Sequence, residues 1–171
     1  ELLSSSTVVQ DSVLVAELVS VSPDPLKHQI VIDKGAGDKV YVGQPVIDAY
    51  GLIGQVDEVN AMSSRVIQIS DSRHAIPVQV NRNGVRAVAE GSGRIDTLII
   101  PNLVDTTDIR VGDLLVSSGL GQRFPVGYPV GVVKSVEQDP GEPFLTVVVR
   151  PSAQLDRSRY VLLVFAGEMQ Q

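Results

Sequence analysis

A series of short, valine-rich runs constrains the fold of this chain more than any other feature. Thirty of the 171 residues are valine, and 15 glycines and 10 prolines punctuate the sequence. Valine is β-branched and favours strands, whereas glycine, proline, asparagine and aspartate favour tight turns. No stretch combines an apolar period of about 3.6 residues with helix-capping residues. The sequence therefore predicts an all-β chain of about twelve strands.

The predicted strands fall into two groups of six. The first group is about 12–22, 28–33, 45–49, 52–59, 65–69 and 76–80. The second group follows the polar break at 81–84 and is 85–91, 96–100, 113–117, 129–136, 145–150 and 159–165. Six short antiparallel strands close naturally into a small barrel, because closure leaves no exposed edge. We therefore expect two six-stranded antiparallel β-barrels.

An internal repeat relates the two groups. Val42-Gly43 and the apolar pair at 46–47 match Val111-Gly112 and the apolar pair at 115–116, at a constant offset. After an eight-residue insertion, the pattern G-x-V-x-x-V at 54–59 recurs at 131–136. Such self-similarity indicates a tandem duplication. We divide the chain into 1–11 (a short helical remnant and linker), 12–83 (first barrel) and 84–171 (second barrel with a disordered C-terminal tail), and leave open whether strands cross between barrels.

The glycines of these repeats are predicted to turn the chain rather than to bind phosphate. A phosphate-binding loop needs a strand, a glycine-rich turn and a following helix. Here residues 52–59 continue as a strand instead. Glycine is the usual residue at positive φ and at bulges. The predicted structural turn residues are Gly35, Gly43, Gly51, Gly54, Gly112, Gly119 and Gly131.

Charge and composition argue against several function classes. A net charge of −6 disfavours nucleic acid, whose affinity comes mainly from lysine and arginine on phosphates. The absence of cysteine excludes disulfides, thiol catalysis and cysteine-based zinc sites. The two histidines and scattered aspartates have no ligand spacing, and 33–38 resembles a calcium loop without its bidentate glutamate. We predict no metal and no cofactor.

No segment has the pattern of a signal peptide or a membrane span. The apolar run YVLLVFAG is far shorter than the roughly 20 residues that a spanning helix needs. The sequence opens at Glu1 without an initiator methionine. We therefore expect a fragment whose targeting region lies elsewhere.

Paired six-stranded barrels are also the architecture of chymotrypsin-type serine proteases, which makes a hydrolase the alternative function. Ser118, followed by Gly119, is the candidate nucleophile, and His28 or His74 would be the base. The orienting carboxylate would be Asp48, Asp57 or Asp71. Because VSSGLGQ lacks the G-D-S-G-G of that family, strand-end and turn roles are favoured for these side chains.

The insertion 119–128 is the candidate partner interface. It carries Leu120, Phe124 and Tyr128, two of them aromatic in a chain with only seven aromatic residues. Such side chains either plug a barrel end or form an exposed patch that binds protein. Plugging is slightly favoured, and an interface is the alternative.

Two similar segments precede the last strand of each half. They are SDSRHA at 70–75 and LDRSRY at 155–160. The pairs Asp71–Arg73 and Asp156–Arg157 are predicted to stabilise turns, because aspartate at a turn commonly binds the backbone two residues on. A charged contact with a partner is the alternative.

Long segments of the chain together resemble the extracytoplasmic region of the rod shape-determining protein MreC family. They are IVIDKGAGDKVYVGQPVIDAYGLIGQV, SRVIQISDSRHAIPVQVNRNGVRA, DIRVGDLLVSSGLGQRFPVGYPVGVVKSV and PSAQLDRSRYVLLVF, in order over about 30–165. Lys39 departs from the family, which usually has glycine there, and VSSG stands where VTSG is common.

The resemblance implies a non-enzymatic scaffold of the bacterial cell-elongation machinery. It implies two barrels related to those of proteases but without a catalytic triad, and a preceding coiled coil whose last turn would be Glu1–Leu3. It implies a periplasmic location, with an N-terminal helix anchoring the full-length protein in the inner membrane. The implied partners are a class B penicillin-binding transpeptidase that the scaffold activates, MreD, MreB through a missing cytoplasmic end, and further copies of the chain.

Overall fold

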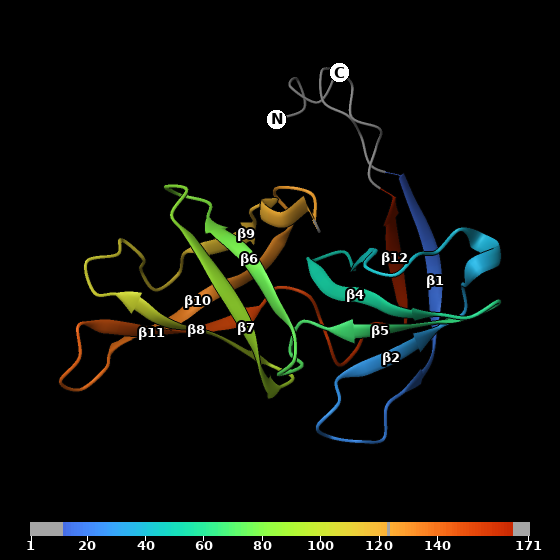
Figure 1. The fold of residues 1–171 in the computed structure, drawn as a ribbon, viewed down its shortest axis with the longest axis horizontal. Helices are drawn as coiled ribbons and strands as arrows, with labels where there is room; N and C mark the ends of the chain where they lie inside the picture. Colours follow the sequence, from blue (N-terminus) through green and yellow to red (C-terminus); the bar gives the residue numbers. More distant parts are fainter. Residues whose placement is uncertain (1–11, 123, 166–171) are drawn as a thin grey trace, which may run out of the picture.

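The structure is a computed structural model that describes residues 12–122 and 124–165, and it contains two closed β-barrels lying side by side (Figure 1). The first barrel consists of β1 (Ser12–Val21), β2 (Gln29–Ile32), β3 (Pro45–Ile47), β4 (Leu52–Val59), β5 (Ser64–Gln68) and β12 (Tyr160–Phe165). The second consists of β6 (Ala75–Val80), β7 (Arg86–Arg94), β8 (Thr97–Val104), β9 (Leu114–Ser117), β10 (Pro129–Gln138) and β11 (Phe144–Pro151). Two 3-10 turns, η1 (Ala36–Asp38) and η2 (Leu120–Gln122), complete the described elements. The predicted all-β, two-barrel fold is confirmed, and each predicted strand overlaps an observed one.

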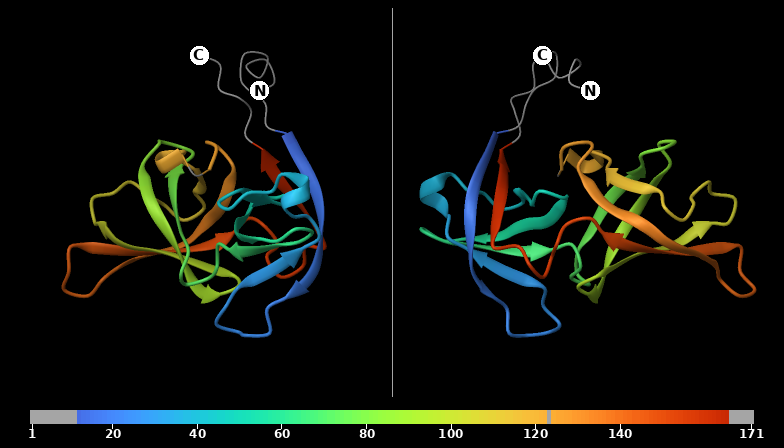
Figure 2. Two further views of the ribbon diagram at one scale, coloured as in Figure 1. Left: turned by 45° about the vertical axis from the view of Figure 1, so that its right-hand side comes forward. Right: turned by 180° about the vertical axis from the view of Figure 1, so that it is seen from behind.

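The predicted division at residue 83 is wrong for two strands. β6 was expected in the first barrel but closes the second, where it pairs with β7 and β9. β12 was expected in the second barrel but closes the first, where it pairs with β1 and β3. Figure 2 (right) shows the chain crossing from β11 in one barrel to β12 in the other. The first long strand, β1, stays in the first barrel.

The repeat predicted from sequence is visible in the backbone. The Gly43 N–H donates to the Val56 carbonyl at 2.7 Å, and the Gly112 N–H donates to the Val133 carbonyl at 2.8 Å. Both glycines have nearly the same positive φ, 93° and 92°. β3 and β4 in the first barrel therefore correspond to β9 and β10 in the second.

A second match between the halves relates β1 to β7. Val-Ala-Glu occurs at 15–17 on β1 and again at 88–90 on β7. Ala16 and Ala89 are both 1% exposed, whereas the preceding valines point outward. Ala16 stands opposite Val161 on β12, and Ala89 opposite Ile76 on β6. β1 and β7 thus occupy equivalent places.

Inward-facing aliphatic side chains of both barrels form one continuous core. β12 contributes Val161 and Leu163, each fully buried. Burial of such side chains contributes about 1.5–3 kcal/mol each. The first barrel therefore depends on a strand that lies more than ninety residues further along the chain than β5.

Close backbone approaches explain several of the predicted turn glycines. A Cβ on Gly54 would overlap the carbonyl oxygen of Ile67, and a Cβ on Gly131 would lie 2.6 Å from that of Arg150. The other positions divide between positive φ (Gly43, Gly112, Gly119) and contact with distant backbone (Gly35, Gly51). All seven lie at turns, strand ends or tight strand contacts, and none begins a helix of the length that a phosphate site requires.

Two expectations concern residues outside the described ranges: the helical remnant and linker at 1–11 and the disordered C-terminal tail. In the part of the chain that the structure describes, no helix is long and apolar enough to cross a membrane.

Candidate partner-binding surface

The outer face of β1 is unusually apolar for a surface. Val13, Val15, Val19 and Val21 are 50%, 53%, 61% and 61% exposed. The alternate residues Leu14, Ala16 and Leu18 face the core. We call the outward valines Val13, Val15 and Val19 the β1 face. Val21 follows a bulge and stands opposite the buried Ile30, so it lies on the other side of the strand. A closed barrel needs apolar residues only inside, so an apolar row on its outside is typical of a protein-binding surface.

Strand β12 lies beside this face and adds residues to it. Leu162 on β12 stands opposite Val15, and Tyr160 stands opposite Glu17. The Arg159 guanidinium lies 5.6 Å from the centre of the Tyr160 ring and its Nε lies 3.4 Å from Glu17 Oε2. Glu17 has the same parity as the valines and lies between Val15 and Val19, so this face combines exposed apolar side chains with one charged pair.

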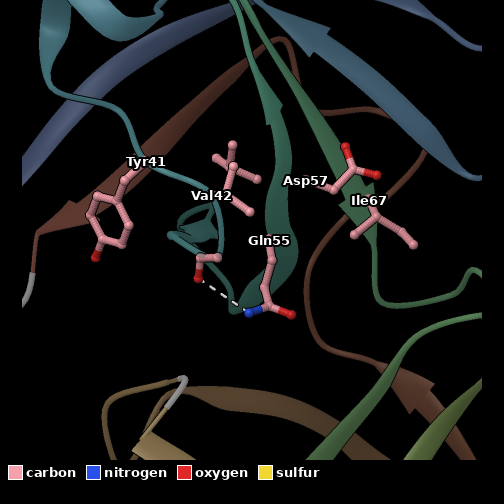
Figure 3. A pocket seen from close by; sticks show the side chains of 7 residues that line it. Tyr41, Val42, Gln55, Asp57 and Ile67 are labelled. Carbon is pink, nitrogen blue, oxygen red and sulfur yellow. Dashed lines mark hydrogen bonds between the residues drawn. The ribbon is translucent and has the colours of Figure 1, made fainter.

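A shallow pocket of about 430 Å³ lies on the same barrel (Figure 3). Its walls include Tyr41, Val42 and Ile67, and Asp57 supplies a carboxylate. The Gln55 amide donates to the Gly43 carbonyl at 3.1 Å and so joins β4 to the loop before β3. Tyr41 and Val42 are 45% and 65% exposed, which adds apolar area to this barrel.

The corresponding face of the second barrel is different. On β7 the outward residues are Arg86, Val88 and Glu90. Val88 is 47% exposed and occupies the place that Val15 has on β1. Charged side chains flank Val88 on both sides, whereas the outward neighbours of Val15 are Val13 and Glu17.

The predicted interface residues of the insertion do not act as one patch. Phe124 is only 4% exposed and its ring packs edge-on against His74, with centroids 6.2 Å apart. Tyr128 is partly buried against the core, whereas Leu120 is 46% exposed. Phe124 is therefore buried, as the plugging alternative expects, and its role in a partner interface stays a prediction. Val126, in the same loop, is 66% exposed.

The β1 face was also missed as a site. Its valines were recognised only as evidence for a strand. The available signal was that VLVAELVSV is apolar at both parities, whereas a barrel strand needs only one apolar face.

The serine, histidine and aspartate candidates are dispersed among structural hydrogen bonds. Ser118 Oγ accepts from the Leu120 N–H at 3.2 Å. His74 Nε2 lies 3.0 Å from Gln55 Oε1, and His28 Nδ1 lies 2.7 Å from Ser70 Oγ. Across residues 12–122 and 124–165, no hydrogen bond joins Ser118 to either histidine. The His28–Ser70 pair was not foreseen, but Ser70 is fully buried and unsuited to attack a substrate.

The aspartate candidates serve the backbone or arginines. Asp48 Oδ1 accepts from the N–H groups of Tyr50 and Gly51, and its Oδ2 accepts from the Gln154 N–H and the Ser158 hydroxyl. Asp57 lies 3.0 Å from Arg65 Nε. Within the described residues, no group of three or more histidine, aspartate or glutamate side chains is placed to hold a metal ion.

Asp71 is the candidate aspartate whose carboxylate is both buried and extensively hydrogen-bonded. Its carboxylate is fully buried and accepts four hydrogen bonds: from the Arg73 side chain at 2.8 and 2.7 Å, from the Arg73 N–H at 2.8 Å and from the His28 N–H at 2.8 Å. Burial raises the pKa of Asp71, but the donors outweigh burial and lower it to about 2. Its counterpart Asp156 is 60% exposed, and its Oδ1 lies as far as 3.9 Å from Arg157 Nε. The predicted turn-stabilising pair is thus strong in one half and weak in the other.

A second buried carboxylate ties the β6–β7 turn to the loop before β9. Arg82 binds Asp113 through two hydrogen bonds of 2.9 Å and also reaches Asp108 at 3.2 Å. The hydrogen bonds from the Arg82 guanidinium hold the pKa of Asp113 below its usual range. These contacts position the barrel rather than form a reactive centre.

Comparison with known proteins identifies similar chains. A family model described as "Rod shape-determining protein MreC, barrel core" matches residues 18–165. The cell shape-determining protein MreC of Escherichia coli (strain K12) is 47% identical over 168 residues, which is 98% of this chain and 46% of that protein. The corresponding protein of Haemophilus influenzae is 46% identical over 98% of this chain and 48% of its own length. The chain therefore spans about half the length of the curated relatives it matches.

Solved structures show the same fold. The crystal structure of MreC from Pseudomonas aeruginosa has a TM-score of 0.87 and 58% identity, covering 90% of this chain and 99% of the other. A complex between a penicillin-binding protein (PBP2) and MreC from Helicobacter pylori contains a chain with a TM-score of 0.68 and 20% identity, covering 92% of this chain and 99% of that one. At that identity, the second likeness concerns the fold alone.

Proposed function

This chain belongs to the rod shape-determining protein MreC family, and from that premise we propose that it is a non-enzymatic scaffold that binds and activates a class B penicillin-binding transpeptidase outside the inner membrane. Two solved structures with this fold support the proposal. One is a complex of a penicillin-binding protein with MreC, and another is the major periplasmic domain of MreC. Activation follows if the scaffold binds one conformation of the transpeptidase preferentially and so raises its population.

The β1 face is the observation that carries the proposal. Three outward valines of β1, Val13, Val15 and Val19, are at least 50% exposed, and the charged pair Glu17–Arg159 lies among them on the same face. A partner that covers this row gains the hydrophobic free energy of burial without any change in the barrel itself. We place the transpeptidase contact here, with Leu120 and the partly buried Tyr128 as additional contacts on the second barrel.

Val15→Glu tests this placement. Because Val15 is outward-facing and exposed, the variant is expected to unfold at the same urea concentration as the parent. Burying the new carboxylate in an interface is costly, so its affinity for the purified elongation transpeptidase should fall at least tenfold in a calorimetric titration. Val88→Glu, at the equivalent position of the second barrel, should retain the parent affinity. Equal affinity of the Val15→Glu variant and the parent would refute the β1 face as the contact.

The absence of enzymatic activity is proposed on the dispersal of the candidate triad. Ser118 accepts a hydrogen bond from its own turn, and the described hydrogen bonds of both histidines go to other residues. A fluorophosphonate probe should therefore leave the folded chain unlabelled. Covalent labelling of Ser118 that depends on His28 or His74 would establish the hydrolase alternative instead.

Further partners are proposed on family membership. They are MreD, MreB through a cytoplasmic segment of the full-length protein, and other copies of the chain. The family also supports a periplasmic location with an inner-membrane anchor in the full-length protein. Sedimentation of the chain at increasing concentration tests self-association, and a monomer throughout the range would argue against it for this part of the protein.

A further inference from the structure

The two repeats exchange their sixth strands. Around the first barrel the strand order is β1-β12-β3-β4-β5-β2, and around the second it is β7-β6-β9-β10-β11-β8. Each strand of the first order has its counterpart at the same place in the second. The first repeat, β1 to β6, therefore supplies five strands of one barrel and sends its sixth to the other, and the second repeat, β7 to β12, does the reverse.

The place that β12 fills is a slot defined only by strand pairing and side-chain fit. β12 pairs with β1 over six residue pairs and with β3 over two. It buries Val161 and Leu163 in the core. These contacts are made by strands of the first repeat and do not depend on which chain supplies β12. A second copy of the chain carries a strand that fits the slot equally well.

The segment that joins β11 to β12 is the looser of the two crossing connections. At the β5–β6 crossing, Ile69, Ser70, Asp71 and His74 are all buried. At 152–159 only Ala153 and Leu155 are buried. This segment is held by the Gln68 amide on the Leu155 carbonyl at 2.7 Å, and by Asp48 on Gln154 and Ser158.

We infer that two copies of this chain associate by exchanging β12, each filling the slot in the first barrel of the other. The exchanged dimer keeps every strand pair of the monomer and loses only contacts of the 152–159 segment, which opens as a hinge. The ratio of exchanged dimer to monomer then depends on the chain concentration relative to the effective concentration of the tethered strand. That effective concentration is in the millimolar range for short connections. The inference is independent of the β1 face and of any transpeptidase.

Cysteine pairs in the core of the first barrel test the exchange, because the chain has no cysteine of its own. Ala16 and Val161 face each other across β1 and β12 and are 1% and 0% exposed. The single variants Ala16→Cys and Val161→Cys are mixed, unfolded in urea, refolded together at high concentration and oxidised. We expect a disulfide-linked dimer in which peptide mapping joins position 16 of one copy to position 161 of the other.

Two controls make a negative result decisive. The double variant Ala16→Cys/Val161→Cys should form the same disulfide within one chain and stay monomeric, which shows that the geometry permits the bond. The next inward pair, Leu14→Cys with Leu163→Cys, repeats the test if the first pair oxidises poorly. If either double variant forms its intrachain disulfide while the mixed single variants yield no interchain bond at millimolar concentration, the exchange is refuted. A dimer that lacks the 16–161 and 14–163 links also refutes it, and leaves association through the β1 face.

Ser158→Ala probes the hinge. The Ser158 hydroxyl shares one proton between Asp48 Oδ2 at 3.1 Å and the Gln154 carbonyl at 2.9 Å in the closed chain, and the Asp48 contact is lost when the segment opens. Two segments open in each dimer, so removing the contact should raise the equilibrium constant for dimer formation by up to about 25-fold, about fivefold for each ordinary hydrogen bond. An unchanged or lower yield would contradict opening at this segment.

Discussion

Replacing Asp71 with asparagine should remove a pH-dependent part of the stability of this protein. The carboxylate has a pKa of about 2 in the folded chain against 3.8 for an ordinary aspartate, because Arg73 and the His28 N–H donate to it. A difference of nearly two pKa units corresponds to about 2 kcal/mol of unfolding free energy. Because the folded-state pKa is the lower one, this contribution is complete well above pH 3.8 and is lost as the pH falls towards 2.

Urea unfolding at a series of pH values measures this contribution. At pH 7, Asp71→Asn should be less stable than the parent by about 2 kcal/mol, with about 1 kcal/mol more if the new amide N–H₂ faces the backbone donors. The difference should shrink between pH 4 and pH 2, where the parent loses its advantage. Asp156→Asn, at the exposed equivalent in the second repeat, should stay within about 0.5 kcal/mol of the parent at every pH. A parent and an Asp71→Asn variant with the same stability and the same acid dependence would refute the reasoning.

Two further predictions concern backbone geometry. Lys39 has a φ of 67° at the end of η1, so Lys39→Gly should raise the free energy of unfolding by about 0.5–1 kcal/mol, and a lower thermal midpoint would contradict this. Gly54→Ala should cost more than about 3 kcal/mol or prevent folding, because its Cβ would overlap the Ile67 carbonyl. Gly131→Ala should cost less, because its Cβ would lie 2.6 Å from the Arg150 carbonyl oxygen instead of overlapping a backbone atom, and equal losses in circular dichroism melts would show that the two sites are not distinguished in this way.

Local sequence patterns predicted much of the fold. Alternating valines and the glycine and proline positions indicated every strand, because strand propensity and turn geometry act over a few residues. The repeat of Val-Gly at 42–43 and 111–112 predicted a duplication, and equivalent hydrogen bonds from Gly43 and Gly112 now confirm it. The residues of the candidate surface were harder to predict from the sequence. The β1 valines could have faced either way, and Phe124 lies against His74 only because the insertion folds back onto the start of β6.

The sequence by itself determined twelve strands, two similar halves and a fold without long helices, since each follows from neighbouring residues. Only the tertiary structure decided which barrel each sixth strand completes. β6 and β12 have similar apolar patterns, and pattern alone does not distinguish the slot between β1 and β3 from the slot between β7 and β9. Pairing between residues as distant as Ala16 and Val161 depends on how whole barrels close and on the connections that cross between them. The same packing buries Asp71 and leaves Asp156 in solvent, which is why two similar aspartates differ in their effect on stability.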